Sequence, residues 1–271
     1  MSIFIKKSKL FLREKFKIYY DYLVIKNSQP LLILQMAKTG SESLFFSLKN
    51  VGYKGVYRLH TLTQNYDYYN YPYLAKKNKL LLQRIQEIKT PVKIITSVRE
   101  PVQRNISDFF QLIKLNDEFQ TLRMPPLLKS YNELAEQLKP NLTLSELQNL
   151  FFQYYPDHFL CLNWFQEEIE KNFNIDVYDF PFPKEKGFLV IKKDNIELLI
   201  LKLELNNNEK EKAIKEFLNL PYFQIIPSNI TEKQQFSYSN LYQDFKQNIS
   251  FPTEYLDKLY KSQYTNHFYI D

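Results

Sequence analysis

The sequence predicts an α/β fold in which a central, mainly parallel β-sheet is flanked by helices. Three short apolar runs in the first 98 residues are each followed by a segment with helical periodicity. A strand-helix order that repeats in this way is typical of parallel sheets, because each helix carries the chain back to the starting edge of the sheet. The later elements extend the sheet and cover it.

The first half holds the predicted core of the sheet. The strands are LLILQM (31–36), GVYRLH (55–60) and PVKIITSV (91–98), which are apolar runs too short to be buried helices. Helices are predicted at 41–50, near 76–89 and over REPVQRNISDFFQLIKL (99–115), where Pro101 suits a first helical turn. A polar, tyrosine-rich loop (61–75) separates the second strand from its helix.

The second half is mainly helical around one predicted hairpin. TLSELQNLFFQYY (143–155) opens with a capping-box pattern, and CLNWFQEEIEKNF (161–173) is amphipathic, with Trp164 expected in the core. GFLVIKK (187–193) and IELLILKLE (196–204) are two strands that turn at Asp194-Asn195, and helices follow near 208–218, 232–246 and 253–264. We therefore expect one domain over 30–271, with an insertion at 116–141.

The amino-acid composition limits the kinds of site that the protein can contain. A single cysteine, Cys161, excludes an internal disulfide, and three histidines without helical pairing give no support to a metal site. No run of apolar residues is long enough to span a membrane, and lysines and arginine interrupt the N-terminus where a signal peptide would be apolar. Metal-independent chemistry in a reducing, cytoplasmic compartment is expected.

The N-terminal segment, residues 1–29, is basic and amphipathic. It carries seven Lys or Arg residues against Glu14 and Asp21, interleaved with aromatic residues, and the whole chain has a net charge of +6. Two readings stay open: an arm packed on the domain, or peripheral contact with the inner face of an anionic membrane. Nucleic acid is not an expected partner, since no recognised binding module accompanies the charge.

The loop AKTGSES follows the first strand and leads into a helix. The start of a helix presents free N–H groups and a positive dipole end, so this loop predicts an anion site. Gly40 permits close backbone approach, Lys38 supplies charge, and the side chains of Thr39, Ser41 and Ser43 supply hydroxyls. The loop lacks the G-x-x-x-x-G-K-[ST] pattern of a Walker A loop, so an ordinary turn is the alternative.

A second anion site is predicted after the third strand. In SVREPVQRNISDFF, Arg99 ends the strand and Ser107 follows eight residues later on the helix. The guanidinium and the hydroxyl can hold one phosphate together. Both predicted sites lie at carboxyl ends of parallel strands, where open α/β sheets bind ligands, and together they indicate a ligand with two separated anionic groups.

These two motifs resemble the nucleotide-binding motifs of sulfotransferases that use 3′-phosphoadenosine 5′-phosphosulfate (PAPS). KTGSESL resembles the 5′-phosphosulfate loop, and REPVQRNISDFF matches the pattern R-x-P-x-x-R-x-x-S-x-[FY] of the 3′-phosphate motif. LNWFQEEIEKNFNIDVYDFPFPKEKG and YKSQYTNHFY are similar to bacterial sulfotransferase-like proteins described as capsular polysaccharide synthesis proteins. The resemblance spans about residues 30–270 and implies a three-layer, P-loop-like fold.

By this resemblance, Lys38 and residues 39–43 bind the 5′-phosphosulfate of PAPS, and Arg99 with Ser107 binds the 3′-phosphate. Lys38 would also neutralise charge on the leaving nucleotide PAP, without a metal. Glu42 departs from the Thr or Ser that is common at its position, and its carboxylate must point away from the bound anion.

The acceptor hydroxyl needs a base. His60 is expected to serve, because it follows the second strand and should emerge at the same sheet edge as Lys38. Glu100 is the alternative base. The implied function is O-sulfation of a carbohydrate, a capsular or surface glycan; a P-loop kinase or NTPase, or a non-catalytic nucleotide-fold protein, are the alternatives.

Overall fold

The computed structural model describes residues 19–65, 67–122, 124–139, 141–228 and 238–270. Its centre is a five-stranded sheet in the order β2-β1-β3-β5-β4. β1 (Leu31–Leu34), β2 (Val56–Leu59), β3 (Val92–Val98) and β5 (Ile196–Lys202) run parallel, and β4 (Phe188–Lys193) pairs antiparallel with β5. The predicted α/β class is confirmed, whereas the P-loop-like assignment stays a prediction.

Alternate side chains of the strands point to opposite faces of the sheet, as the pleat requires. On one face, Leu31 and Ile33 pack with α2 (Ser41–Asn50) and α9 (Asn207–Leu218). On the other face, Leu32 and Leu34 belong to a larger core to which α3 (Pro72–Glu87) and α4 (Pro101–Leu122) contribute. The result is three layers with both faces of the sheet buried.

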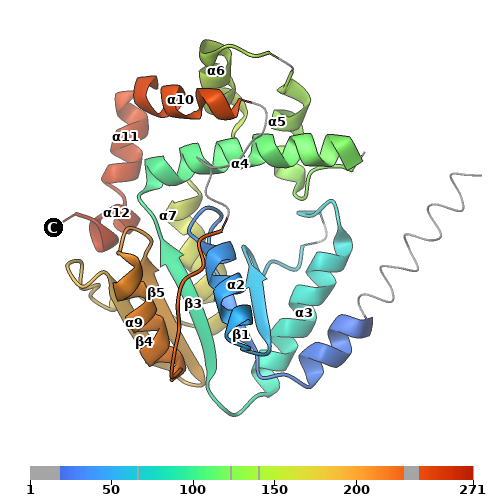
Figure 1. Cartoon of the computed structure of the whole chain (residues 1–271), viewed down its shortest axis with the longest axis vertical. Coiled ribbons are helices and arrows are strands. Elements are labelled where there is room, and N and C mark those ends of the chain that lie inside the picture. The colour runs from blue at the N-terminus through green and yellow to red at the C-terminus, as the bar shows by residue number, and fades with distance from the viewer. Residues whose placement is uncertain (1–18, 66, 123, 140, 229–237, 271) are drawn as a thin grey trace, which may run out of the picture.

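The remaining helices gather around α4. They are α5 (Asn132–Gln137), α6 (Leu144–Tyr154), α7 (Leu160–Phe165), α8 (Lys171–Phe173), α10 (Tyr242–Asn248), α11 (Thr253–Tyr260) and α12 (Gln263–Phe268). Short helical turns η1 (Lys129–Tyr131), η2 (Gln166–Glu170), η3 (Val177–Asp179) and η5 (Ser239–Leu241) connect them. Figure 1 shows α4 crossing the end of the sheet to which β3 points, with α5, α6 and α10 beyond it.

Most predicted elements are present, with informative differences in length. α2 begins and ends where predicted, and the Thr143–Glu146 capping box opens α6. The hairpin turns at Asp194, whose φ of 52° is the left-handed conformation that asparagine and aspartate tolerate. α4 runs seven residues further than predicted, to Leu122, so the segment predicted as an insertion (116–141) begins inside this helix.

Two predictions fall partly outside the described residues. Of the basic segment 1–29, residues 1–18 lie outside them, and 19–26 are helical. Of the helix predicted at 232–246, residues 232–237 lie outside, and α10 begins at Tyr242. Within the described ranges, no helix is long and apolar enough to cross a membrane.

The strand order fixes where a ligand can bind. From β1 the chain moves outward to β2 on one side and then returns to β3 on the other side of β1. The order therefore reverses between β1 and β3, and open α/β sheets bind ligands at the carboxyl ends of the strands at such a point. The loops that carry Lys38 and Arg99 follow β1 and β3, so they flank this position.

Candidate functional site

The loop between β1 and α2 has a backbone that its glycine makes possible. Lys38 and Gly40 have φ angles of 63° and 91°. The positive φ of Gly40 is what requires glycine here; a Cβ would also lie 2.9 Å from Leu203 Cδ1, so the end of that side chain would have to shift. Gly40 precedes α2 without a side-chain cap, which leaves the first N–H groups of the helix available to an anion.

The three hydroxyls of this loop have different roles. Thr39 is 1% exposed, and its Oγ1 donates to Met36 O at 2.7 Å, so it stabilises the turn. Ser43 Oγ donates to Ser228 O (3.1 Å) and accepts from Ser228 N (2.9 Å), which fastens a distant segment to α2. Ser41 lines the neighbouring cavity. Thr39 is therefore the predicted ligand-binding residue that the structure places in the loop's interior.

Glu42 is held by groups that partly neutralise it. Its Oε2 forms an ion pair with Arg58 Nη1 at 3.1 Å, and its Oε1 accepts from Ser228 Oγ at 3.0 Å. A carboxylate in the first turn of a helix is also favoured by the helix dipole. Glu42 of α2 thus has structural partners in β2 and in the segment at Ser228.

Arg99 couples the second predicted anion site to the first. Its Nη1 donates to Lys38 O at 3.0 Å, across the gap between the two strand ends. Tyr264 of α12 fixes the backbone at this residue, because its hydroxyl accepts from Arg99 N (3.1 Å) and donates to Arg99 O (2.9 Å). Ser107 lies on α4, 2% exposed.

A cavity of about 630 Å³ joins these residues. Its lining includes most of the predicted site, namely Lys38, Gly40, Ser41, Glu42, Ser43, His60, Arg99 and Ser107. Lys38 Nζ donates to Gln111 Oε1 on α4 at 3.3 Å, so the lysine extends from its loop toward the helix. Two loops and one helix, far apart in the sequence, therefore supply one polar surface.

His60 lines the cavity just after β2, and part of its surface stays open to the outside. Its Nδ1 faces Gln35 O at 2.9 Å, which favours the tautomer with Nδ1 protonated and the Nε2 lone pair available. Burial lowers the pKa of His60, and the hydrogen bond to Gln35 opposes that shift. At neutral pH the imidazole is therefore uncharged and can accept a proton.

Glu100, the alternative base, is engaged elsewhere. Its carboxylate accepts from Val102 N (3.1 Å) and Gln103 N (2.7 Å) at the start of α4, and from the hydroxyl of Tyr260 at 2.9 Å. The cavity lining does not include this residue. The geometry favours His60 over Glu100.

Trp164 and Glu168 support the strand end at His60. Trp164 Nε1 donates to His60 O at 3.2 Å, and Glu168 accepts from Thr61 Oγ1 (2.5 Å) and Leu62 N (2.6 Å). Burial raises the pKa of Glu168, and these hydrogen bonds oppose that shift. Glu168 lies in η2, a π-helical turn, which is a frequent feature of functional sites. Sequence reasoning expected Trp164 in the core and missed Glu168; nothing in the helical pattern marks a carboxylate that turns inward.

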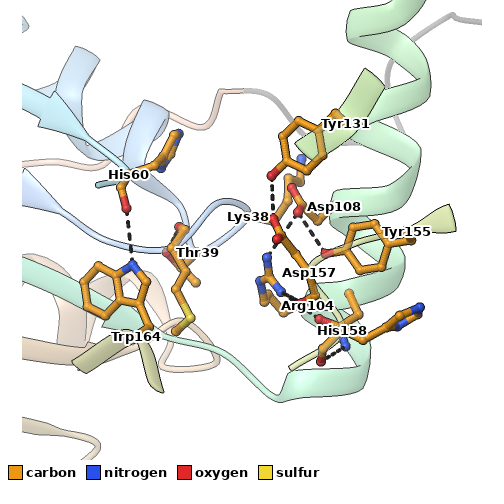
Figure 2. Close-up of polar contacts among 12 residues, drawn as sticks. Lys38, Thr39, His60, Arg104, Asp108, Tyr131, Tyr155, Asp157, His158 and Trp164 are labelled. Atoms are coloured by element: carbon orange, nitrogen blue, oxygen red, sulfur yellow. Dashed lines mark hydrogen bonds and ion pairs between the residues drawn. The ribbon is translucent and has the colours of Figure 1, made fainter. Parts of the chain in front are cut away.

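A buried charged cluster forms the opposite wall (Figure 2). Arg104 is fully buried, and its guanidinium donates to Asp157 O (2.8 Å) and Asp108 Oδ2 (3.1 Å). Tyr155 donates to Asp108 Oδ2 at 2.9 Å, and Tyr131 to Asp157 Oδ2 at 2.5 Å. Burial raises the pKa of Asp157, and Arg104 counteracts this. Figure 2 shows His60 and Trp164 on one side of Thr39 and this cluster on the other.

Fold and site together define an α/β protein with a cavity, lined by polar and apolar residues, at the carboxyl ends of its parallel strands. Residues 136–270 match the model of a family described as "Putative capsular polysaccharide synthesis protein". No curated protein and no solved structure matches the chain. Among the residues that the structure describes, no three His, Cys, Asp or Glu side chains are grouped as a metal site would need.

The matched region supplies one part of the site. Asp157, Trp164 and Glu168 of the cavity wall lie within it, as does Tyr264, which fixes Arg99. Lys38, His60 and the two anion motifs precede it. The family match therefore includes residues that line or support the cavity, and the two predicted anion motifs lie outside it.

Proposed function

We propose that this protein transfers a sulfuryl group from PAPS to a hydroxyl of a carbohydrate acceptor in capsular or surface polysaccharide synthesis. The observation that carries the proposal is that one cavity is lined by both predicted anion motifs and by His60. The family description supports a role in capsular polysaccharide synthesis. The cytoplasm, where the product PAP would also be released, is the proposed location.

The residues present fit a ligand with two anionic ends. The uncapped start of α2 and Lys38 would hold the 5′-phosphosulfate, and Ser41 offers a hydroxyl there. Arg99 and Ser107 would hold the 3′-phosphate, which distinguishes PAPS from ATP. Thr39 and Ser43 would contribute by stabilising the conformation of the loop, because their hydroxyls form hydrogen bonds with Met36 and Ser228.

When bound, PAPS supplies an activated sulfuryl group on a phosphate leaving group. Lys38 places a positive charge where negative charge grows as the bond to the nucleotide breaks, and the fixed N–H groups of α2 add to this stabilisation. Little covalent work falls to the protein, so orientation and charge dominate. The loop is suited to this role because Gly40 and Arg99 fix its backbone.

His60 removes the proton of the acceptor hydroxyl. Its lowered pKa keeps the imidazole neutral, and the bond from Nδ1 to Gln35 O directs Nε2 as the proton acceptor. General-base catalysis of this kind contributes about 10²- to 10⁴-fold. Trp164 and Glu168 hold the backbone in place at His60 and at Leu62.

Thermal-shift measurements with PAP, PAPS, ATP and NAD test which nucleotide the protein binds. Stabilisation by PAP and PAPS alone is expected, and it should grow with ligand concentration as binding to the native state requires. Lys38→Ala and Arg99→Ala should lose the shift. Lys49 is an exposed lysine in the last turn of α2, so Lys49→Ala should keep the thermal shift. A shift with ATP that requires Mg²⁺ would support a kinase or NTPase instead.

Transfer of labelled sulfate from PAPS to a glycan tests the reaction. His60→Ala should lose about 10²-fold or more in rate while PAP still binds, because the base acts on the acceptor and not on the nucleotide. Full activity in both His60→Ala and Lys38→Ala would contradict the assigned roles.

A further inference from the structure

The cavity changes character along α4. The residues of this helix that line it are first polar, Ser107, Asp108 and Gln111, then apolar, Leu112 and Leu115, and last Asn116. With a rise of about 1.5 Å per residue, Leu115 lies about 12 Å along the helix from Ser107. The end near the anion motifs is therefore polar, and the helix then offers two leucines to the cavity before Asn116.

Leucines also form the wall that faces this part of α4. Leu127 and Leu128 come from the segment before η1, and Leu134 and Leu138 from α5 and its end. The tyrosine-rich loop holds this wall in place through backbone bonds, Lys129 N to Tyr68 O (3.3 Å) and Asn70 N to Leu127 O (3.2 Å). The loop 61–75 and the segment 116–141 thus contribute, together with α4, to one largely apolar compartment.

The apolar surface continues beyond the cavity. Leu122 is seven residues after Leu115, so both lie on the same face of α4, and Leu122 is 64% exposed. Met124 and Leu127 are 42% and 37% exposed just beyond the end of the helix. Exposed apolar groups next to an apolar compartment indicate a ligand that extends outward and is itself apolar there.

A free oligosaccharide does not fit this lining. Its hydroxyls need hydrogen-bonding partners, and moving a hydroxyl against hydrocarbon without a partner costs about 1–3 kcal/mol in protein measurements. Polar groups gather at the anion motifs and His60, where a reacting sugar would be placed. The leucines offer nothing to further sugars and offer contact area to a hydrocarbon chain.

We propose that the acceptor is an amphiphilic saccharide, a sugar that carries a hydrocarbon chain, with the sugar beside His60 and the chain between α4 and the leucines of 127–138. The placement of the sugar rests on the proposed function. The binding of the hydrocarbon chain rests only on the leucine-lined part of the cavity, so this binding can be measured without turnover.

The single tryptophan is a built-in probe of ligand entry, because Trp164 lines the cavity. Methyl, butyl, hexyl and octyl β-D-glucosides would be titrated into the full-length protein below their micellar concentrations, with Trp164 fluorescence as the signal. Burial of each added methylene should tighten binding about fourfold until the compartment is full. The methyl glucoside should bind weakly.

Four variants, one of them a control, test where the hydrocarbon chain binds. Leu115→Gln and Leu138→Gln should each abolish the dependence on chain length, whereas Leu150→Gln, a half-buried leucine of α6 outside the cavity, should leave it unchanged. Leu115→Phe keeps the site apolar but fills it, so affinity should stop rising at a shorter chain. This variant decides the question if the glutamine variants fold poorly.

Affinity that is independent of chain length, or a dependence that persists unchanged in all the cavity variants, would overturn the proposal. The same titrations with PAP present separate it from the proposed function. A chain-length dependence without any PAP binding overturns only the nucleotide assignment, and PAP binding without chain-length dependence overturns only the amphiphilic acceptor.

Discussion

Lowering the pH should destabilise the protein through His158, which is buried beneath the charged wall of the cavity. Its Nε2–H donates to Phe151 O at 2.8 Å, and its Nδ1 lies 3.1 Å from the hydroxyl of Tyr255, which donates to it. Rings of Phe151 and Tyr155 pack edge-on against the imidazole. Burial lowers the pKa of His158 to about 4, because the charged imidazolium would be held away from water among these rings.

The size of the effect follows from this pKa. An unfolded histidine has a pKa of about 6.5, so between about pH 6.5 and pH 4 the unfolded chain binds a proton that the folded chain does not. Stability is therefore lost as the pH falls through this window. From about pH 7.5 to about pH 5 the loss assigned to His158 is about 2 kcal/mol.

Urea denaturation of the wild type and of His158→Gln across this range measures the effect. Glutamine can still donate to Phe151 O but does not titrate. Asp157 and Glu168, whose raised pKa values act in the opposite direction, and His60 titrate in both proteins and cancel in the difference. A difference in unfolding free energy that stays constant within about 0.5 kcal/mol from pH 7.5 to 5 would refute the reasoning.

Four further substitutions, one of them a control, probe the supports of the site. Gly40→Ala and Gly52→Ala each force alanine into a left-handed conformation, at a cost of about 1–2 kcal/mol in stability. A Cβ at Gly52 meets nothing within 4 Å, so only Gly40→Ala should also weaken PAP binding. Equal PAP affinities of the two variants would contradict the role of the loop. Arg104→Met leaves buried carboxylates unpaired and should cost about 3–5 kcal/mol in urea denaturation, and a cost below 1 kcal/mol would show that the cluster is hydrated. Tyr264→Phe removes both hydrogen bonds to the backbone of Arg99 and should weaken PAP binding, measured by calorimetry, without touching the cavity; unchanged affinity would show that α12 does not position the arginine.

Local patterns predicted the fold well because they arise from local physics. The strand at 92–98, the helix at 41–50 and the capping box at Thr143 each depend on side chains next to one another in the chain. The meeting of Lys38 with Arg99 was also predictable, because parallel strands bring their carboxyl ends to one edge.

Contacts between distant segments were not predictable where the strand order does not bring those segments together. Glu168 reaches Thr61 and Leu62 through a π-helical turn, and no periodicity in the sequence indicates that turn. Arg104 matches a motif position that invites a ligand-binding role, yet the fold buries it against Asp108. In both cases the role of a charged residue depends on which groups the tertiary structure places beside it.

Glu42 shows how such a placement changes the meaning of a residue. A carboxylate inside an anion-binding loop should repel phosphosulfate, and in water two unit charges about 4 Å apart interact by about 1 kcal/mol, rising as the site is closed from solvent. Arg58, 3.1 Å away, offsets that charge, and Ser228 holds the second oxygen in place. Arg58 also lines the cavity, so the pair contributes a nearly neutral surface instead of a repulsive one. On this reasoning the positive character of the loop comes from Lys38, Arg99 and the start of α2, and Arg58 is what makes Glu42 compatible with it.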